Sequence, residues 1–441
     1  MRQCAAMTLL QRAAAIAVAL IVFTGAGLLL LRAGGAGIGL GPEASPTPTP
    51  VTPSPEPTAT EATGTPEATA PADVAAVFAG IEADMEELRG LPPAGIGPPE
   101  VISRDQLNVE LRELFDSDYP PAERRADNIT LRAMGLLGPD EDVAEIQLGL
   151  LGDQVLGFYD DREKRMVVVS DAGVDANAKF TYSHEYTHAL QYAAFPLTRH
   201  EDEVEGNDDA DLALTSLVEG DATLAMTAWA IGGGLTSDEI LDIRTTPLPD
   251  TTGVPDWMLQ TLEFPYSAGF AWMLELAGDP FAPDFAAVDE AFEDPPDSTE
   301  QVLHFDKWLN REPPVEVDVI DVAQELGSGW EQVESTPIGE AFIRITLDHF
   351  DLEPEVSTDA AAGWGGDRLV VAAGPDDAFA LVWVLAWDTP ADADAFSSAY
   401  ASVLERLEFP AQISSLPGGE VVVVHASSAQ LVETVLAAVG G

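Results

Sequence analysis

An uncharged apolar stretch starts at residue 13 and is about as long as a helix that spans a bilayer. Arg2 and Arg12 precede this stretch, whereas only Arg32 follows it closely, and the imbalance favours an N-terminus in the cytoplasm. We therefore expect a cytoplasmic segment over residues 1–12 and an uncleaved, single-pass transmembrane signal-anchor over residues 13–33. The bulk of the chain would then lie outside the cytoplasm.

Residues 34–72 do not have the pattern of a hydrophobic core, because proline alternates with threonine, serine and alanine from residue 42 onward. We expect a disordered stalk that holds the rest of the chain away from the membrane. The alternative is a cleaved secretory signal, in which Gly34 and Ala36 are the small residues before the cut. In that case the protein is secreted.

After the stalk, apolar residues recur at the spacings of helices and strands. A helical pattern follows Asp73, and Ser103 with Gln106 forms a capping box at the start of a second helix. Two β-rich runs, residues 154–159 and 165–169, are separated by a charged turn and therefore predict a hairpin.

The last part of the chain has the pattern of a small two-layer unit of strands and helices. The expected elements are a helix over 339–350, strands over 368–373 and 379–387, a helix over 391–407 that opens with Thr389 and Pro390, a strand over 420–425 and a final helix capped by Ser427 and Gln430. The predicted fold class is α+β, with one domain over residues 73–329 and a second over residues 330–441.

Charge and cysteine content exclude several classes of function. The formal net charge of −56 would repel the phosphate backbone of a nucleic acid, so we expect no nucleic-acid partner. The single cysteine, Cys4, excludes an intrachain disulfide and a zinc ribbon or finger. A metal site in this chain would have to use histidine and carboxylate ligands.

A helical pattern over residues 178–193 contains the motif H-E-x-x-H. His184 and His188 project from one helical face a turn apart, so both imidazoles can reach one tetrahedral Zn²⁺ ion. Glu185 would face the open side of the metal and act as the general base toward a water molecule. A surface helix with a chance pair of histidines gives the same motif, so a third ligand is needed.

The next long helix, predicted over residues 209–231, supplies a candidate third ligand. Glu219 lies there among leucine, valine and methionine, where a carboxylate is costly unless it is paired or coordinates a metal. A glutamate on the solvent face beside Asp221 is the alternative, although Gly220 and Ala222 suit close packing of two helices. The three ligands would hold one zinc ion per chain and leave one position for water.

The motif followed by Glu219 in a Glu-Gly context resembles the gluzincin metallopeptidases, the zincin group that includes thermolysin and the aminopeptidase N type. The resemblance covers about a quarter of the chain and implies a zincin-like domain, a small sheet with active-site helices. Residues 264–274 resemble a Pro-Tyr-x-x-Gly segment that opens a helix in aminopeptidase N-type enzymes, which implies that Tyr266 is the oxyanion donor. An ordinary aromatic beside a helix N-terminus is the alternative. Residues 154–159 would be the edge strand that binds the substrate backbone in zincins.

The chain departs from the gluzincin pattern at two places. Residues 73–183 contain no Gly-x-Met-Glu-Asn segment, which holds the free amine of the substrate in the aminopeptidases. An endopeptidase is therefore favoured over an aminopeptidase. The aspartate that orients a zinc histidine in thermolysin-like enzymes would fall at Thr223, with Asp221 displaced from that place.

Two other polar features are expected to be structural. The acidic residues 201–211, between the two ligand helices, could bind Ca²⁺, but their spacing matches no EF-hand loop and favours a solvated loop. His425, at the end of a predicted strand, is expected to be a hydrogen-bonded structural histidine.

The sequence as a whole predicts a membrane-anchored, extracytoplasmic zinc peptidase that hydrolyses peptide or protein substrates. Two alternatives stay open. One is a non-catalytic surface binding module in which a structural zinc ion holds the two helices together, and the other is a zinc hydrolase of a non-protein amide or ester.

Overall fold

The computed structural model describes residues 72–440, apart from 155–156, 170–173 and 247–250. The predicted cytoplasmic segment, the signal-anchor and nearly all of the stalk lie outside the described residues. Within the part of the chain that is described, no helix is both long and apolar enough to cross a membrane.

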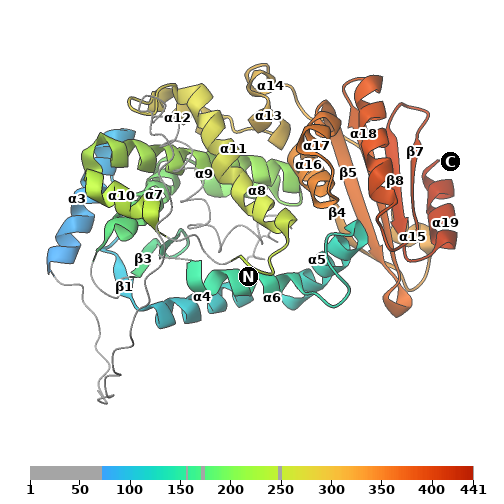
Figure 1. Cartoon of the computed structure of the whole chain (residues 1–441), viewed down its shortest axis with the longest axis horizontal. Helices are drawn as coiled ribbons and strands as arrows, with labels where there is room; N and C mark the ends of the chain where they lie inside the picture. The colour runs from blue at the N-terminus through green and yellow to red at the C-terminus, as the bar shows by residue number, and fades with distance from the viewer. Residues whose placement is uncertain (1–71, 155–156, 170–173, 247–250, 441) are drawn as a thin grey trace, which may run out of the picture.

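The described chain has an α+β fold with two separate β-sheets, which lie toward opposite ends of the long axis (Figure 1). The first elements are α3 (Ala72–Arg89), β1 (Glu100–Ile102), α4 (Arg104–Asp118), α5 (Pro121–Met134), α6 (Val143–Gln154), β2 (Gly157–Asp160) and β3 (Arg165–Val169). The predicted capping box of Ser103 and Gln106 is present at the start of α4.

The smaller sheet has the strand order β1-β3-β2, so β2 is an edge strand, and it pairs antiparallel with β3. The predicted hairpin is confirmed, but its first strand begins at Gly157 because α6 continues to Gln154. Glycine suits this position, since a Cβ there would lie 2.7 Å from the carbonyl oxygen of Val167.

A layer of helices follows the small sheet and contains the H-E-x-x-H motif. Its elements are α7 (Ala176–Ala194), α8 (Leu197–Val204), α9 (Asp208–Trp229), the π-helical turn Ala230–Gly234, α10 (Ser237–Thr245), α11 (Asp256–Ala277), α12 (Phe285–Glu293), α13 (Thr299–Leu303), α14 (Phe305–Leu309) and α15 (Val322–Leu326). α9 packs against α7, α11 and α3, and most of its residues are buried. The two long helices predicted from periodicity are thus confirmed as α7 and α9.

The helices α9 and α11 touch backbone to backbone. A Cβ on Gly220 would lie 2.5 Å from the carbonyl carbon of Gly269, and a Cβ on Gly269 would lie 2.2 Å from the carbonyl oxygen of Ser216. The close packing expected from Gly220 is therefore confirmed, and its partner is α11.

The Pro-Tyr-x-x-Gly segment does not open a helix in this chain. Pro265 lies inside α11, which begins nine residues earlier at Asp256, after Pro255 at the N-cap. A proline removes one helical hydrogen bond and is best accommodated in the first turn. Here the buried apolar side chains on both sides of Pro265, such as Leu262 and Phe270, keep the helix continuous.

The larger sheet is built from the C-terminal residues. The remaining elements are β4 (Glu331–Thr336), α16 (Gly339–His349), α17 (Pro354–Ala361), β5 (Trp364–Ala373), the 3₁₀ turn Pro375–Asp377, β6 (Phe379–Trp387), α18 (Pro390–Leu404), β7 (Ala411–Ser415), β8 (Val421–Ala426) and α19 (Ala429–Val439). The strand order is β4-β5-β6-β8-β7, and all neighbours are antiparallel. The last helix is capped by Ser428, one residue after the predicted Ser427.

Each face of the larger sheet carries its own apolar cluster. α18 packs on one face through Phe396 and Tyr400, and α15 with α19 covers the other through Val322 and Val432 (Figure 1). The first face also contacts α5, and its cluster continues without a break into α4, α6, α11 and α16. The predicted division at residue 330 falls just before β4, and the chain on its two sides shares this cluster.

Of the acidic residues 201–211, only 205–207 form a loop, in which Glu205 and Gly206 are exposed. Residues up to 204 belong to α8, and α9 begins at Asp208 with Asn207 as its N-cap. Asp208, Asp209 and Asp211 are at most 2% exposed, because carboxylates are favourable in the first turn of a helix and the carboxylate of Asp209 accepts hydrogen bonds from Thr299.

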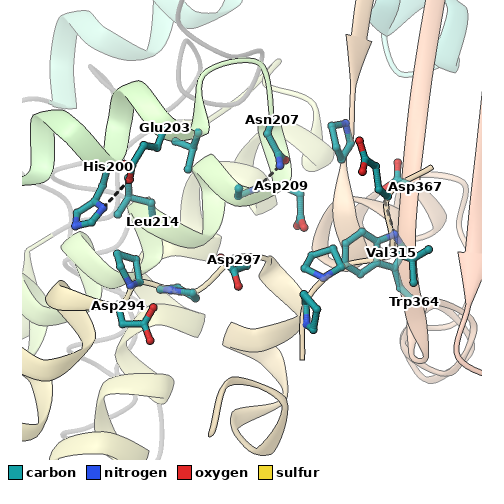
Figure 2. A pocket seen from close by; sticks show the side chains of 18 of the residues that line it. His200, Glu203, Asn207, Asp209, Leu214, Asp294, Asp297, Val315, Trp364 and Asp367 are labelled. Carbon is teal, nitrogen blue, oxygen red and sulfur yellow. Dashed lines mark hydrogen bonds and ion pairs between the residues drawn. The ribbon is translucent and has the colours of Figure 1, made fainter. Parts of the chain in front are cut away.

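A cavity of about 610 Å³ separates this end of α9 from β5. Figure 2 shows Asp209 on one wall and Asp367 with Trp364 on the other. The carboxylate of Asp367 accepts hydrogen bonds from the indole nitrogens of Trp364 and Trp383. Both aspartates are therefore held by protein donors.

Candidate metal centre

The helix α7 places the H-E-x-x-H motif in the interior of the molecule. Its N-cap is Asp175, whose side chain accepts a hydrogen bond from the backbone N–H of Ala178. Most residues from Ala176 to Gln191 are buried against α3, α9 and the small sheet. The motif therefore does not belong to a surface helix with a chance pair of histidines.

The three predicted metal ligands converge. The Nε2 atom of His184 lies 3.0 Å from Oε2 of Glu219 and 3.1 Å from Nε2 of His188, and Nε2 of His188 lies 3.4 Å from the same carboxylate oxygen. Ligands at the corners of a tetrahedron about 2.0–2.1 Å from a zinc ion would be separated by about 3.3 Å. The group can therefore hold a metal ion.

Glu219 reaches the histidines because α9 carries it across α7 near the contact of α9 with α11. Its side chain is 17% exposed, so it is not on a solvated face of the helix. Burial raises the pKa of a carboxyl group, but the charges of the two imidazoles and their hydrogen bonds reverse this effect and hold the pKa of Glu219 well below its usual range. Glu219 is thus ionised, as a metal ligand must be.

The pKa of His188 shifts in the opposite direction to that of Glu219. Burial lowers the pKa of an imidazole, but the negative charge of Glu219, its hydrogen bond and the charge of Glu185 outweigh burial and raise the pKa of His188 to about 9. Without a metal ion, the two carboxylates therefore favour a proton at the place where a cation would bind.

Glu185 lies beside the ligands without being one of them. It is 6% exposed, and its Oε2 accepts a hydrogen bond of 3.1 Å from the backbone N–H of Tyr159 on the edge strand β2. Burial raises the pKa of Glu185, against the effect of the two histidines. A carboxylate with a raised pKa next to a cation site suits proton transfer.

Tyr266 is also at the centre. It is 5% exposed, its ring stacks on that of His184 with centroids 6.0 Å apart, and its hydroxyl hydrogen-bonds Glu219. Burial and the charges of Glu219 and Glu185 raise the pKa of Tyr266 well above its usual value, so the phenol stays a hydrogen-bond donor. All five predicted site residues are thus brought together.

One neighbour of the candidate ligands lies outside the predicted motif. Gln191 is one turn after His188 on α7, and its Oε1 lies 2.9 Å from Nδ1 of that histidine. Its Nε2 donates to Asp221 over 2.8 Å, and Asp221 contacts the guanidinium of Arg89 at 3.1 Å. Gln191 follows His188 at the i, i+3 spacing of helix neighbours, so the sequence does contain a signal for this contact. Arg89 lies 132 residues before Asp221, so no local sequence pattern indicates that contact.

His425 lies outside this centre, as expected. It is 1% exposed, with Nδ1 2.8 Å from the carbonyl oxygen of Ala133 and Nε2 3.1 Å from the hydroxyl of Tyr400. Burial lowers the pKa of His425 to about 4, so the ring is neutral. The prediction of a hydrogen-bonded structural histidine is confirmed.

Comparison with known proteins reaches only the C-terminal part of the chain. No curated protein and no solved structure matches the sequence. Residues 325–436, from the end of α15 to α19, match a family described as a domain of unknown function (DUF8575). That similarity covers less than half of the chain and none of the five residues of the candidate metal centre.

Proposed function

We propose that the protein is a zinc-dependent peptidase of gluzincin type, with His184, His188 and Glu219 as ligands of one zinc ion. The observation that carries the proposal is the convergence of these three ligand atoms beside Glu185, a buried carboxylate that is not a ligand. Two imidazole nitrogens and one carboxylate oxygen are a ligand set that catalytic zinc sites use.

Each residue beside the ligands has a role in this proposal. A bound zinc ion supplies Lewis acidity, which polarises a carbonyl group and lowers the pKa of water. Glu185 takes a proton from the attacking water and passes it to the leaving amine, and the backbone N–H of Tyr159 fixes its orientation. Tyr266 donates a hydrogen bond to the oxygen on which negative charge develops.

Two features favour catalysis over a structural zinc site. Structural zinc is bound by four protein ligands, whereas the cluster found among the described residues has three. A structural site also has no use for Glu185, whose burial beside a second carboxylate is costly. The edge strand β2, next to the site, offers a backbone to which an extended substrate can pair, which suits an endopeptidase.

We further propose that the catalytic part faces outward on a single-pass membrane anchor, residues 13–33, or is secreted if that segment is cleaved. The apolar stretch and the proline-rich stalk of the sequence support this placement.

The first prediction tests the role of Glu185 in the purified full-length chain. Glu185→Gln should reduce hydrolysis of denatured casein and of quenched fluorescent peptides by at least about a hundredfold, because the general base is lost. Zinc content, measured by plasma mass spectrometry, should stay near one ion per chain. Glu290→Gln, an exposed glutamate on α12, is the matched control and should keep full activity.

Peptide hydrolysis that survives in Glu185→Gln would contradict the mechanism. A wild-type chain that binds zinc but cleaves no peptide would favour one of the two alternatives. A parallel screen with simple esters and with cell-wall peptides would then separate a zinc hydrolase of another bond from a structural zinc site.

A further inference from the structure

Behind the metal ligands, three buried side chains from three helices form one hydrogen-bonded chain. Gln191 lies on α7, Asp221 on α9, and Arg89 is the last residue of α3. None of the three is more than 2% exposed. The resemblance to gluzincins assigns no role to any of them.

The contacts of Gln191 determine how its amide is oriented. Its nitrogen is 3.0 Å from the carbonyl oxygen of Val218 and 2.8 Å from a carboxylate oxygen of Asp221, and both partners only accept hydrogen bonds. The amide nitrogen must face these acceptors, so the amide oxygen faces Nδ1 of His188 at 2.9 Å. Because this oxygen only accepts, Nδ1 of His188 must carry a proton.

This orientation selects the form of His188 that a metal needs. With the proton on Nδ1, the neutral ring presents the lone pair of Nε2, the atom that lies 3.1 Å from Nε2 of His184. We propose that Gln191 is a positioning residue for the metal ligand His188, and that Asp221 and Arg89 hold Gln191 in that role. The inference rests on the proposed function, because it assumes that His188 binds a metal.

Asp221 and Arg89 anchor the far end of this chain. Both side chains are fully buried, the guanidinium lies 3.1 Å from the carboxylate, and it also contacts Asp289 at 2.9 Å and the ring of Phe285 at 4.3 Å. The Nε atom of Arg89 also donates to Oδ2 of Asp221 over 3.3 Å, and the same oxygen accepts the hydrogen bond from Gln191. The fixed guanidinium thus holds the carboxylate oxygen that orients the amide of Gln191.

These contacts also admit a simpler role, in which Gln191 only ties α7 to α9 through Val218. The two roles differ in which atom of residue 191 matters. A tie between helices needs the donating nitrogen, whereas positioning of His188 needs the accepting oxygen.

The experiment measures zinc affinity of the full-length chain by competition with a chelator of known affinity. Gln191→Met preserves length and volume and removes the acceptor, and it should weaken zinc binding by about 10- to 100-fold. In the zinc-loaded wild type, the proton on Nδ1 of His188 should be visible by NMR, and in Gln191→Met it should exchange with solvent. Gln430→Met, at an exposed position on α19, is the control and should match the wild type.

A rescue pair separates the two roles. Gln191→Glu alone keeps the acceptor but faces the carboxylate of Asp221, so zinc binding should weaken. Adding Asp221→Asn removes the like charge and supplies a donor, so Glu at 191 can again accept from His188 and zinc affinity should recover at least tenfold. The double variant still cannot donate to the carbonyl oxygen of Val218, so a role that depends on the contact with Val218 predicts no recovery.

Each outcome bears on the inference. A folded Gln191→Met variant with wild-type zinc affinity, or a double variant no better than Gln191→Glu, would overturn it. A wild-type chain that binds zinc without peptide hydrolysis would contradict the proposed peptidase but leave the positioning of His188 supported by the same affinities. A wild-type chain that binds no zinc would overturn both.

Discussion

At the scale of residues, the candidate metal centre gives two carboxylates different surroundings and therefore opposite pKa shifts. Glu219 and Glu185 are both buried, but the imidazoles hydrogen-bond Glu219 and lower its pKa, whereas burial prevails at Glu185 and raises its pKa. Opposite shifts within one site assign different roles. The stable anion is suited to binding a cation, and the group that accepts a proton more readily is suited to acid–base chemistry.

The pKa of His188 gives a prediction for zinc binding. In the metal-free protein this pKa is about 9, so the imidazole is charged at pH 7 and zinc must displace its proton. The apparent association constant should therefore rise about tenfold per pH unit from pH 7 to pH 9 and level off above that value. Chelator competition at each pH measures it, and calorimetry in two buffers counts the protons released. An association constant that does not change between pH 7 and pH 9 would contradict this account.

At the scale of elements, the contact between α9 and α11 decides where Glu219 lies. The backbones touch at Gly220 and Gly269, next to Glu219 on one helix and three residues after Tyr266 on the other. Larger side chains would separate the two helices. Two glycines far apart in sequence thus bring the candidate metal ligand Glu219 and the phenol of Tyr266 together.

Gly220→Ala tests this contact. The new Cβ would lie 2.5 Å from the carbonyl carbon of Gly269, and neither backbone can yield without moving its helix. We expect a loss of about 1–3 kcal/mol in the free energy of unfolding, together with weaker zinc binding because Glu219 moves away from the histidines. Gly149→Ala, an exposed position on α6 with open space around it, is the control and should be neutral or stabilising by up to about 1 kcal/mol. Equal behaviour of the two variants in denaturant titrations would count against the contact.

The sequence predicted those elements and contacts that leave a local periodic signal. The ligand helices, the hairpin and the helix cap at Thr389 have such signals and were found. The edge strands β4 and β7 leave no such signal, because their sequences EQVEST and AQISS are polar and only partly buried. The acidic residues at the start of α9 predict a solvated loop from sequence alone, because the contact that buries Asp209 is made by Thr299, 90 residues later, and leaves no local signal.

At the scale of the whole molecule, buried polar groups join segments that are distant in the sequence. Asp367 on β5 accepts hydrogen bonds from the backbone N–H groups of Ile338 and Gly339, and the backbone N–H of Asp209 on α9 donates to the carbonyl oxygen of Pro337. The chain carries a net charge of −56, so uncompensated carboxylates would repel one another. A carboxylate that accepts hydrogen bonds from backbone N–H groups, as Asp367 does, instead becomes a fixed contact between the larger sheet and the start of α16.

His425 also links distant segments through hydrogen bonds, and this link, the joint between β8 and α5, depends on pH. Its ring connects β8 to the carbonyl oxygen of Ala133 on α5 and to Tyr400 on α18, and burial lowers its pKa to about 4. The unfolded chain takes up this proton near pH 6.5. The contribution of His425 to stability is therefore complete above pH 6.5 and is lost as the pH falls toward 4, by about 2 kcal/mol at pH 5.

His425→Asn removes that titration while it keeps a polar side chain at the joint. Denaturant unfolding of both proteins, with zinc removed by a chelator, should be compared at pH 8 and pH 5. The wild type should lose about 2 kcal/mol more than the variant between these pH values, because every other titrating group is common to both and cancels in the difference. Identical pH dependence in the two proteins would mean that His425 is protonated in the folded state at pH 5, and that the joint between β8 and α5 tolerates a charge.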